Sequence, residues 1–448
     1  ATDLPEQVTI QKDAASISAA GFTTRIMVNK QEVQTYQRPE SIFFGSDTEY
    51  AAGVKGITTF GGNHWRNTFT YGEQVVNEGK LSRSWEISTG SLATPENGTW
   101  TGTGWTGQPL IVQWEDSVRA TLGIYDSFKE KEGFTEVIYP AMDGKIYFME
   151  LSTGLETRAP IDLGQVFKGT AMLDPRGYPL LFVGQGIPTP TEPKQTMGAW
   201  IRAISLIDNQ EIWSLGGRDP FSPRLWQAFD ASPLLDAATD TLLTVGENGV
   251  LYTCKLHTSY DLQAGTLSLN PDPPEKYTYT ATGYGESDNK RWWGMEDSLT
   301  IWRNYGFFAD NGGYLQCVDL NTLELLYVSD VGDDQDATMV LEEAPAEGTI
   351  YLYGANTGEV VWQVEQISGY WASPVVIYDQ NEKGYVLQCD RNGLLRMYDG
   401  ISGQQICEVD LGSRIESTPA VFNNMLVVGT RGQYGRGEGQ KIIGVMIK

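Results

Sequence analysis

The sequence predicts an all-β fold, a β-propeller of four-stranded antiparallel blades, and three observations point to it. A unit of four short β-like runs recurs along the 448 residues. Tight turns that contain glycine separate the runs, and the last run of several units carries a large aromatic residue. The copies follow one another every ~40–60 residues, which is typical of propeller blades, because each blade buries its two apolar faces against its neighbours.

The four runs of the unit, strands A to D, support this prediction in turn. Strand A follows a polar or tryptophan-containing loop, and seven copies are recognisable, at residues 107–114, 169–174, 231–236, 297–302, 336–342, 372–379 and 417–422. Strand B comes next, and a turn such as GENG or DRNG then supplies the positive φ that a tight hairpin to strand C requires. Strand D carries Trp213, Trp362 or Tyr327, and we expect these side chains to form wedges between adjacent blades.

The last copy of the unit lacks a strand D, and the other end of the chain supplies one. Residues 417–448 contain strands A, B and C only. The run GKLSRSWEISTG (79–90) has the strand D pattern, with Trp85 at the wedge position, and no strands A to C of its own. We therefore expect this N-terminal strand to pair beside residues 441–446 and close the ring, which removes the exposed edges of an open array.

The number of blades has two interpretations. Seven strand A motifs give seven blades by literal count. After TIYLYG the chain passes at once into ANTGEVVWQVE, a strand D with no strand C before it, so eight blades is the alternative if a stretch near 353–355 is absent. We assign residues 78–448 to a single propeller domain, in which 78–90 complete the last blade. Residues 1–77 are expected to form an N-terminal extension packed on the propeller.

Composition excludes several classes of function. The chain has 57 acidic and 32 basic residues, dispersed along it, and a net charge of −25, which argues against binding of nucleic acid. No apolar run is long enough to span a membrane, and no signal peptide is visible from Ala1, which leaves export open. Two histidines are too few for a multi-histidine metal centre, and neither has a nucleophile motif such as GxSxG nearby. The four cysteines are scattered, and the three inside apolar runs are expected to be buried free thiols.

The loops before strand A contain the candidate site. Strand A lines the central channel of a propeller, so these loops surround one mouth of the channel. We predict a ligand-binding site there, formed by Trp105, Lys168, Trp226, Asp230, Trp293, Glu296, Asp297, Asp336, Trp371, Arg414 and Glu416. Aromatic faces combined with carboxylates suit a sugar, a cationic group or a peptide. The alternative is that the tryptophans pack and plug the end of the channel.

The run DVGDDQD is a candidate calcium site. It offers hard oxygen ligands through Asp330, Asp333, Asp334 and Asp336. The spacing is not that of an EF-hand, and the alternative is a solvated acidic loop. No residue is assigned a catalytic role.

Several motifs resemble those of bacterial propeller repeat proteins of the PQQ-binding-like type (PQQ, pyrroloquinoline quinone). GITTFGGNHWRNTFTYG (56–72) is similar to GVxTFRGNxxRxxxYG of that group, and GTGWTGQPLIV, DDQDATMVLEE, GYWASPVV and RIESTPAVFNNMLVVGTRG also match. The TGxxxW endings resemble the repeats of PQQ dehydrogenases and of the barrel-assembly outer-membrane lipoprotein, and the resemblance runs from about Gln31 to Lys448. The chain departs from the group at Gly61–Gly62, where Arg-Gly is usual, and at 353–355, where group members carry most of an additional blade.

The resemblance implies a quinoprotein-like, exported or cell-surface protein, with a lipoprotein anchor as one form. PQQ dehydrogenases resemble one another in a vicinal cysteine disulfide and in a Glu/Asn/Asp calcium set with a catalytic Asp, and neither can be aligned here, so PQQ is not expected. We predict a monomeric, non-catalytic propeller that binds a protein, peptide or carbohydrate, with calcium as an open question. The alternatives are a PQQ- and calcium-dependent dehydrogenase and a carbohydrate-processing or carbohydrate-binding protein.

Overall fold

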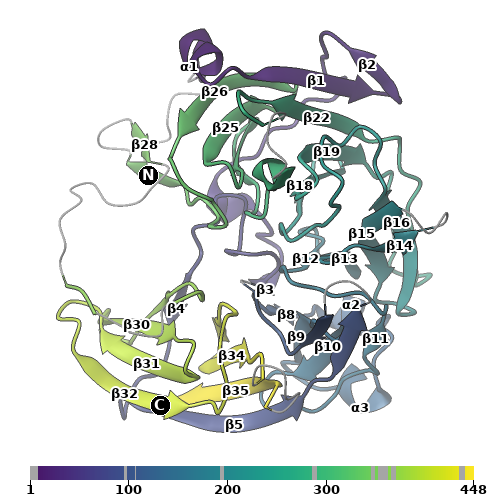
Figure 1. Ribbon diagram of the computed structural model, residues 1–448. Coiled ribbons are helices and arrows are strands. Elements are labelled where there is room, and N and C mark those ends of the chain that lie inside the picture. The colour runs from purple at the N-terminus through teal and green to yellow at the C-terminus, as the bar shows by residue number, and fades with distance from the viewer. Residues whose placement is uncertain are drawn as a thin grey trace.

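The computed structural model describes residues 9–94, 98–105, 107–191, 196–284, 290–344, 349–351, 362–364, 370–432 and 439–448. These residues form mostly β-strands, with three short α-helices, α1 (Ala14–Ala19), α2 (Asp116–Arg119) and α3 (Asp126–Lys129), and two 3-10 helices, η1 (Asp47–Glu49) and η2 (Lys290–Trp293). The strands form sheets arranged in a ring around a centre, and all their pairings are antiparallel except that of β4 with β29 (Figure 1). The predicted all-β fold and β-propeller are therefore confirmed.

Six of the described sheets contain strands A to D of the repeat in spatial order. Blade 1 consists of β8 (Leu110–Gln113), β9 (Thr135–Pro140), β10 (Lys145–Glu150) and β11 (Ile161–Asp162). Blade 2 consists of β12 (Met172–Leu173), β13 (Leu180–Gly184), β15 (Thr196–Ser205) and β16 (Gln210–Gly217). Blade 3 consists of β17 (Leu234–Asp236), β18 (Thr241–Gly246), β19 (Val250–Lys255) and β22 (Glu275–Thr280). Blade 4 consists of β23 (Thr300–Trp302), β24 (Tyr305–Ala309), β25 (Tyr314–Asp319) and β26 (Glu324–Asp330).

The remaining blades complete the ring. Blade 6 consists of β29 (Val375–Tyr378), β30 (Gly384–Cys389), β31 (Leu394–Asp399) and β32 (Gln405–Asp410). Blade 7 consists of β33 (Ala420–Phe422), β34 (Met425–Gly429), β35 (Lys441–Ile447) and β5 (Leu81–Ser88). Blade 5 is described as the two strands β27 (Glu342–Ala344) and β28 (Thr349–Tyr351). The join near 353–355 lies outside the described residues, so the choice between seven and eight blades stays a prediction.

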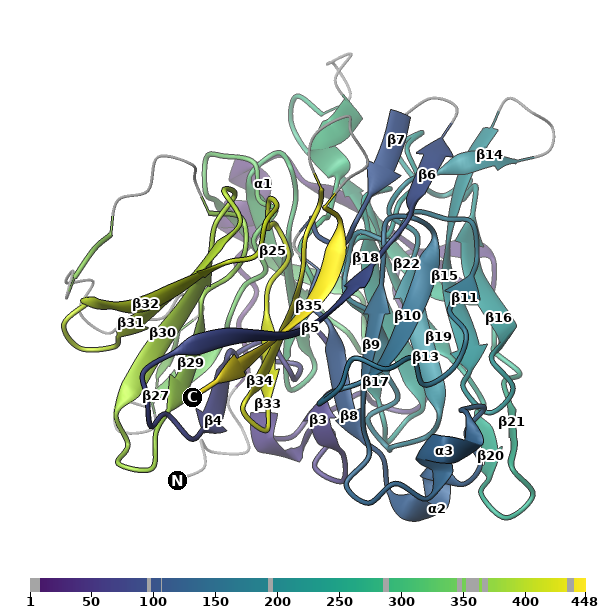
Figure 2. The ribbon, with the colours of Figure 1, turned by 90° about the horizontal axis from the view of Figure 1, so that it is seen from below.

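The ring is closed by an N-terminal strand, as predicted. Strand β5 pairs antiparallel with β35, from Ser88 opposite Lys441 to Leu81 opposite Ile447. Figure 2 shows this dark blue strand lying beside the yellow C-terminal strand. The first and last parts of the propeller therefore share one sheet, and neither leaves its pairing edge open at this position.

A β-bulge precedes the wedge position in the outer strands of four blades. In β5 the register shifts at Ser84, between the pairs Arg83–Val445 and Trp85–Gly444. The same shift precedes the wedge residues Trp213 in β16, Tyr327 in β26 and Cys407 in β32. A bulge bends the strand and increases its twist, which re-aims the side chain that follows.

Residues 58–69, which we call the channel segment, cross the centre of the ring (Figure 1). Backbone hydrogen bonds join it to the inner edges of four blades: Leu173 donates to Thr58 at 2.8 Å, Ile301 to His64 at 2.8 Å, Leu341 to Trp65 at 3.0 Å and Val376 to Phe69 at 2.8 Å. The flanking strands β3 (Lys55–Ile57) and β4 (Thr70–Glu73) pair with β8 and β29. The segment thus satisfies inner-edge N–H groups that an empty channel would leave to water.

Other N-terminal residues extend the outside of blade 3. Strand β1 (Thr23–Val28) pairs with β22, and β2 (Gln31–Val33) pairs with β1, which gives this sheet six strands. Two hairpins lie outside the four-stranded blades, β6 (Ser91–Thr94) with β7 (Gly98–Thr101) and β20 (Ser259–Asp261) with β21 (Thr266–Ser268). One further strand, β14 (Thr189–Thr191), pairs with β15. The division into an extension at 1–77 and a propeller domain at 78–448 stays a prediction.

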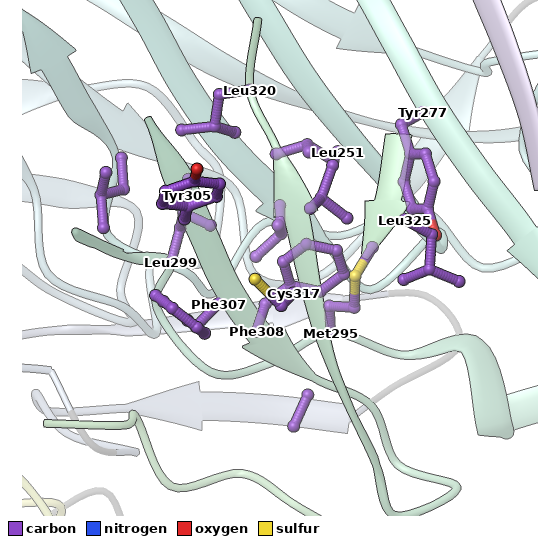
Figure 3. Packing of buried hydrophobic residues seen from close by; sticks show 14 of the residues in the cluster. Leu251, Tyr277, Met295, Leu299, Tyr305, Phe307, Phe308, Cys317, Leu320 and Leu325 are labelled. Carbon is purple, nitrogen blue, oxygen red and sulfur yellow. The ribbon is translucent and has the colours of Figure 1, made fainter. Parts of the chain in front are cut away.

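The core lies between the faces of neighbouring blades. Figure 3 shows one such cluster, in which Cys317 and Phe308 of blade 4 pack with Leu251 and Tyr277 of blade 3. Three cysteines, Cys254, Cys317 and Cys389, are buried free thiols, as the sequence predicts, while Cys407 is only partly buried. Among the helices of the described residues, none has the length and apolar character that crossing a membrane requires.

Candidate functional site

A cavity of about 500 Å³ opens where loops that precede three innermost strands meet the channel segment. Its lining is mainly apolar, and we call it the anchor pocket; it consists of Phe60, Phe69, Trp105, Asp336, Ala337, Thr338, Val340, Trp371, Ser373 and Pro374. Phe60 and Phe69 come from the channel segment and contact each other edge to face, with ring centroids 5.4 Å apart. The segment that fills the channel therefore also provides part of the pocket wall.

Two of the predicted tryptophans form the mouth of the anchor pocket. The rings of Trp105 and Trp371 lie 5.7 Å apart in an edge-to-face arrangement. A cation covers a face of each indole: the Arg391 guanidinium lies 4.1 Å from the Trp371 ring, and the Lys168 ammonium lies 5.0 Å from the Trp105 ring. Cation–π contacts of this kind orient the rings. Trp371 is nevertheless 42% exposed, so one edge of the pocket presents an apolar surface to solvent.

Lys168 binds a group of buried carboxylates next to this mouth. Its ammonium contacts Asp230 and lies 3.2 Å from Oε1 of Glu247. Carboxylate oxygens of Asp230, Glu247 and Glu296 lie within 4.8 Å of one another, so this group could hold a metal ion. Although burial opposes its charge, the neighbouring Asp230 and Glu247 raise the pKa of Lys168 above its ordinary value. A metal ion would have to compete with this ammonium for the same oxygens.

Glu296 has an unusual protonation equilibrium within this group. Burial and the charge of Glu247 raise its pKa to about 7. One oxygen accepts a hydrogen bond from Asn311 Nδ2 at 3.0 Å. Arg224, at 3.6 Å from Oε2 of Glu247, adds a second cation to the group. Burial also raises the pKa of Asp230 well above its ordinary value, so two of the three carboxyl groups bind a proton more readily than usual.

Arg414 and Glu416 form a separate buried cluster. Glu416 is 1% exposed, and its oxygens lie 3.0 Å from Nε of Arg414 and 3.3 Å from Nε of Arg431. Arg431 also lies over the ring of Trp100 at 5.6 Å. These residues connect the last blade to the loop before the first blade, and they do not line the anchor pocket.

The other predicted site residues lie partly or wholly in packing positions. Trp226 is half-buried against Met142, Val166 and Ile187, in the same cluster as Trp105. Trp293 is buried, and its indole N–H donates to the Tyr279 carbonyl at 2.9 Å, between blades 3 and 4. Asp297 is also buried, and burial raises its pKa well above the ordinary range.

The acidic run after β26 is exposed and hydrogen-bonded to its own backbone. Asp330 accepts from the Gly332 N–H at 2.9 Å, and Asp333 accepts from the Asp334 N–H at 2.9 Å. Asp336 lines the anchor pocket. None of these residues belongs to the carboxylate group around Lys168, which is the one cluster of potential metal ligands that the described residues contain. The acidic run stays a candidate calcium site, with a solvated loop as the alternative.

Several residues of the site carried no recognisable sequence signal. Phe60 and Phe69 lie in the N-terminal motif, and nothing local indicates that this motif enters the channel. Glu247 belongs to the GENG turn, whose glycine and asparagine predict only a hairpin. Arg391 lies in the DRNG turn in the same way. For Glu247 and Arg391, the one usable sequence signal is a charged residue inside a blade turn that lies next to the predicted mouth of the channel.

The structure defines the class of protein as a β-propeller, and solved structures of that class are similar to it. No model of a known protein family and no curated protein matches the chain. BamB from Moraxella catarrhalis is 15% identical, over 82% of this chain and 100% of that chain, with a TM-score of 0.40. A europium-containing methanol dehydrogenase is 12% identical, over 87% and 98%, with a TM-score of 0.45. Quinohemoprotein alcohol dehydrogenase from Comamonas testosteroni is 11% identical, over 90% and 82%, with a TM-score of 0.43. These likenesses concern the fold.

One feature that the sequence resemblance implies for PQQ dehydrogenases, the vicinal cysteine disulfide, is not available to this chain. No two of the four cysteines are adjacent, so a vicinal disulfide cannot form. Two of the three carboxylates that could hold a metal ion, Asp230 and Glu247, already form ion pairs with Lys168, and Glu247 also with Arg224. The channel segment occupies the ring centre and is hydrogen-bonded to the inner strands. We therefore derive no chemistry from this cofactor.

Proposed function

We propose that this protein is a non-catalytic binding propeller that captures a protein partner by an apolar side chain inserted into the anchor pocket. The observation that carries the proposal is the pairing of a cavity of about 500 Å³ with the half-exposed indole of Trp371 at its edge. Apolar cavities rimmed by aromatic side chains are typical anchor sites of protein interfaces, where a few buried side chains supply most of the binding energy.

The lining favours an apolar anchor over a sugar. Phe60, Phe69, Val340 and Pro374 have no side-chain hydrogen-bonding group, and the two indoles, Trp105 and Trp371, have one N–H donor each. The polar lining residues are Asp336, Thr338 and Ser373. A pyranose would bury several hydroxyl groups here without enough partners, and each unpaired hydroxyl costs roughly 1–3 kcal/mol. An aromatic or branched aliphatic side chain has no such cost.

The acidic loop on one side of the pocket favours a basic partner segment there, away from Arg391 and Lys168 at the two indoles. Asp336 lines the cavity, and Asp330, Asp333 and Asp334 are exposed on the same loop. The whole chain has a net charge of −25. Lysine or arginine residues beside the anchor would gain from this field, which acts mainly on the rate of association.

We further propose that the protein acts as a monomer outside the cytoplasm, exported or at the cell surface. The support is its resemblance to exported propeller repeat proteins. Detection of the native protein in the periplasmic, surface or extracellular fraction of its source cells would test this part. Recovery from the cytoplasmic fraction alone would contradict it.

A defined peptide tests the binding proposal. The probe is a fluorescein-labelled peptide with one tryptophan between lysines, and the reference is the same peptide with alanine in place of tryptophan. We expect the tryptophan peptide to bind at least tenfold more tightly to the wild-type protein, and Trp371→Ala to abolish this difference. The matched control is Ile401→Ala, which removes a side chain that is 81% exposed in the turn between β31 and β32. Equal binding of both peptides, or an equal loss in both variants, would overturn the proposal.

A further inference from the structure

A second cavity lies between blades 2 and 3 and shares no lining residue with the anchor pocket. Its volume is about 550 Å³, and we call it the seam pocket. Its wall includes Trp213 from β16, Arg218 from the loop that follows, Lys276 from β22, and Lys30 from the turn between β1 and β2. Three regions that are distant in sequence therefore build it, one of them the N-terminal hairpin.

The seam pocket is present because the strand D tryptophan of blade 2 lacks the contact with a glycine turn of the next blade that joins other blades. Trp213 follows the bulge of β16, as Trp85 follows the bulge of β5. The ring of Trp85 lies against Gly154, in the tight turn between strands C and D of the next blade. In blade 3 the same connection is a long excursion, residues 256–274, with its own hairpin β20–β21. Trp213 consequently lines a cavity instead of covering a glycine turn.

The lining of the cavity has one more cation than carboxylates, although the protein as a whole is strongly acidic. Its lining contains three cations, Lys30, Arg218 and Lys276, and two carboxylates, Asp219 and Asp272. Lys276 is paired with Asp219 at 2.8 Å. Within the described part of the chain, Lys30 and Arg218 form no ion pair. Arg218 donates a hydrogen bond to the Leu225 carbonyl at 2.8 Å. Two cations in the same wall as Trp213 thus have no carboxylate partner.

Part of the cavity wall is apolar and stiff. Pro271, Pro273 and Pro274 line it together with Trp213. Proline and tryptophan faces bind flat rings without losing side-chain freedom, because proline is cyclic and the indole has two torsions only. A guanidinium offers forked donors that match a carboxylate or a phosphate, and a lysine adds a mobile point charge.

We propose that the seam pocket binds a small organic anion that carries a flat apolar ring. The ring packs against Trp213 and the prolines, and the anionic group is bound by Arg218 and Lys30. This site is independent of the anchor pocket, so either proposal can fail without the other. A pocket of this size suits a ligand of cofactor or drug dimensions.

Calorimetric titration with phenyl phosphate tests the proposal, with inorganic phosphate and phenol as its two separate halves. We expect phenyl phosphate to bind at least tenfold more tightly than either half, and added salt to weaken its binding. Benzoate in a parallel titration distinguishes a carboxylate site from a phosphate site. Binding of inorganic phosphate alone, with no gain from the ring, would identify an adventitious ion only and would overturn the proposal, as would no heat from phenyl phosphate at millimolar concentration.

Two variants assign the binding to this cavity. Lys30→Ala with Arg218→Ala removes both unpaired cations and should weaken phenyl phosphate at least tenfold while the melting temperature stays unchanged. Trp213→Ala should weaken phenyl phosphate and leave inorganic phosphate unaffected. The control Lys55→Ala removes an exposed lysine of β3, which pairs with β8 of blade 1 and does not line the cavity, and should change neither. Undiminished binding in the double variant would overturn the proposal even if Trp213→Ala fails to fold.

Discussion

The indole N–H of Trp85 donates a hydrogen bond to the Leu151 carbonyl at 2.8 Å, and this contact joins the last blade to the first. The ring also lies against Gly154. Trp362 repeats the relationship two junctions earlier, between blades 5 and 6, because its N–H donates to the Gly400 carbonyl at 3.0 Å and its ring lies against Gly403. A tryptophan of strand D therefore fits onto the glycine turn of the next blade, and Trp85 does so at the point where the ring closes.

Removal of this side chain should destabilise the closure. We expect Trp85→Ala to lower the free energy of unfolding by about 3 kcal/mol, since a large side chain leaves a cavity between two blades. Trp85→Phe should cost less, about 1–2 kcal/mol, because it mainly loses the hydrogen bond to Leu151. Urea denaturation measures both. The control is Trp371→Ala, whose side chain is 42% exposed and should cost less than Trp85→Ala; an equal loss at the two positions would contradict the role of Trp85.

The sequence was sufficient to predict the blades and the closing strand, because both follow from local patterns. Alternation, glycine turns and the position of Trp85 are properties of short windows, and each blade repeats them. The channel segment could not be predicted in this way. Its residues 58–69 have neither strand nor helix periodicity, and its partners belong to four blades distributed over the whole chain. Contacts between residues so far apart in the sequence produce no local sequence pattern.

The candidate site was predicted in part for the same reason. Radial symmetry correctly suggests that residues before strand A approach one another, and Trp105 and Trp371 do so at 5.7 Å. Symmetry says nothing of the direction in which a side chain points. Trp293 ends the 3-10 helix η2, and its indole is directed to the Tyr279 carbonyl instead of the pocket. The burial of a particular indole depends on the loop conformation, which the repeat does not determine.

Arg66 should be essential for the position of the channel segment. It is fully buried, and its guanidinium donates to four uncharged oxygens: Leu299 O at 3.0 Å, Thr59 Oγ1 at 2.7 Å, Phe60 O at 2.8 Å and Ser232 O at 2.8 Å. Burial lowers its pKa to about 10, so the cation is still present at neutral pH. We expect Arg66→Met to reduce the free energy of unfolding by about 3–5 kcal/mol, because buried acceptors lose their donors.

The control for this substitution is an arginine on the outer surface. Arg83→Met removes a guanidinium that pairs with Glu86 on exposed strand β5 and should cost less than about 1 kcal/mol. Thermal unfolding of both variants measures the difference. If Arg66→Met were as stable as Arg83→Met, the channel segment would not depend on its buried arginine.

His64 should make the stability of the propeller fall in mild acid. Burial lowers its pKa from 6.5 to about 3, so the folded protein keeps the ring neutral while the unfolded chain protonates it below pH 6.5. The stabilising contribution is therefore complete above pH 6.5 and is lost as the pH falls toward 3. At pH 5 the loss from this one residue is about 2 kcal/mol. His64→Phe should remove this part of the pH dependence; identical pH profiles of the two proteins would contradict it.

Addition of PQQ with calcium should not produce dehydrogenase activity. The reason is the absence of an adjacent cysteine pair and the contact of Lys168 with Asp230 and Glu247. The assay follows dye reduction with alcohols and aldose sugars as substrates, and equilibrium dialysis follows binding of the quinone by its absorption. Dye reduction that requires added PQQ would instead support the dehydrogenase alternative.

Lys168 should behave as the resident cation of the buried carboxylates. In the wild-type protein its ammonium contacts Asp230 and Glu247, and we expect calcium to leave the melting temperature unchanged. Lys168→Met removes this charge and leaves Asp230, Glu247 and Glu296 close together, which should cost about 3–5 kcal/mol. Three carboxylates within 4.8 Å then offer oxygen ligands to a divalent ion.

Calcium should consequently stabilise the Lys168→Met variant, and increasingly so as its concentration rises above the dissociation constant. If Lys168→Met folds only when calcium is present, this also supports the prediction, because calcium then stabilises the folded variant. The double variant Lys168→Met with Glu296→Gln should lose most of the rescue, because one ligand is gone. If calcium stabilises the wild-type protein instead, Asp333→Asn with Asp334→Asn decides the source. Loss of the effect in that variant would place the ion at the exposed acidic run, whereas its persistence would show that the buried carboxylates bind calcium with Lys168 in place and that this prediction is wrong.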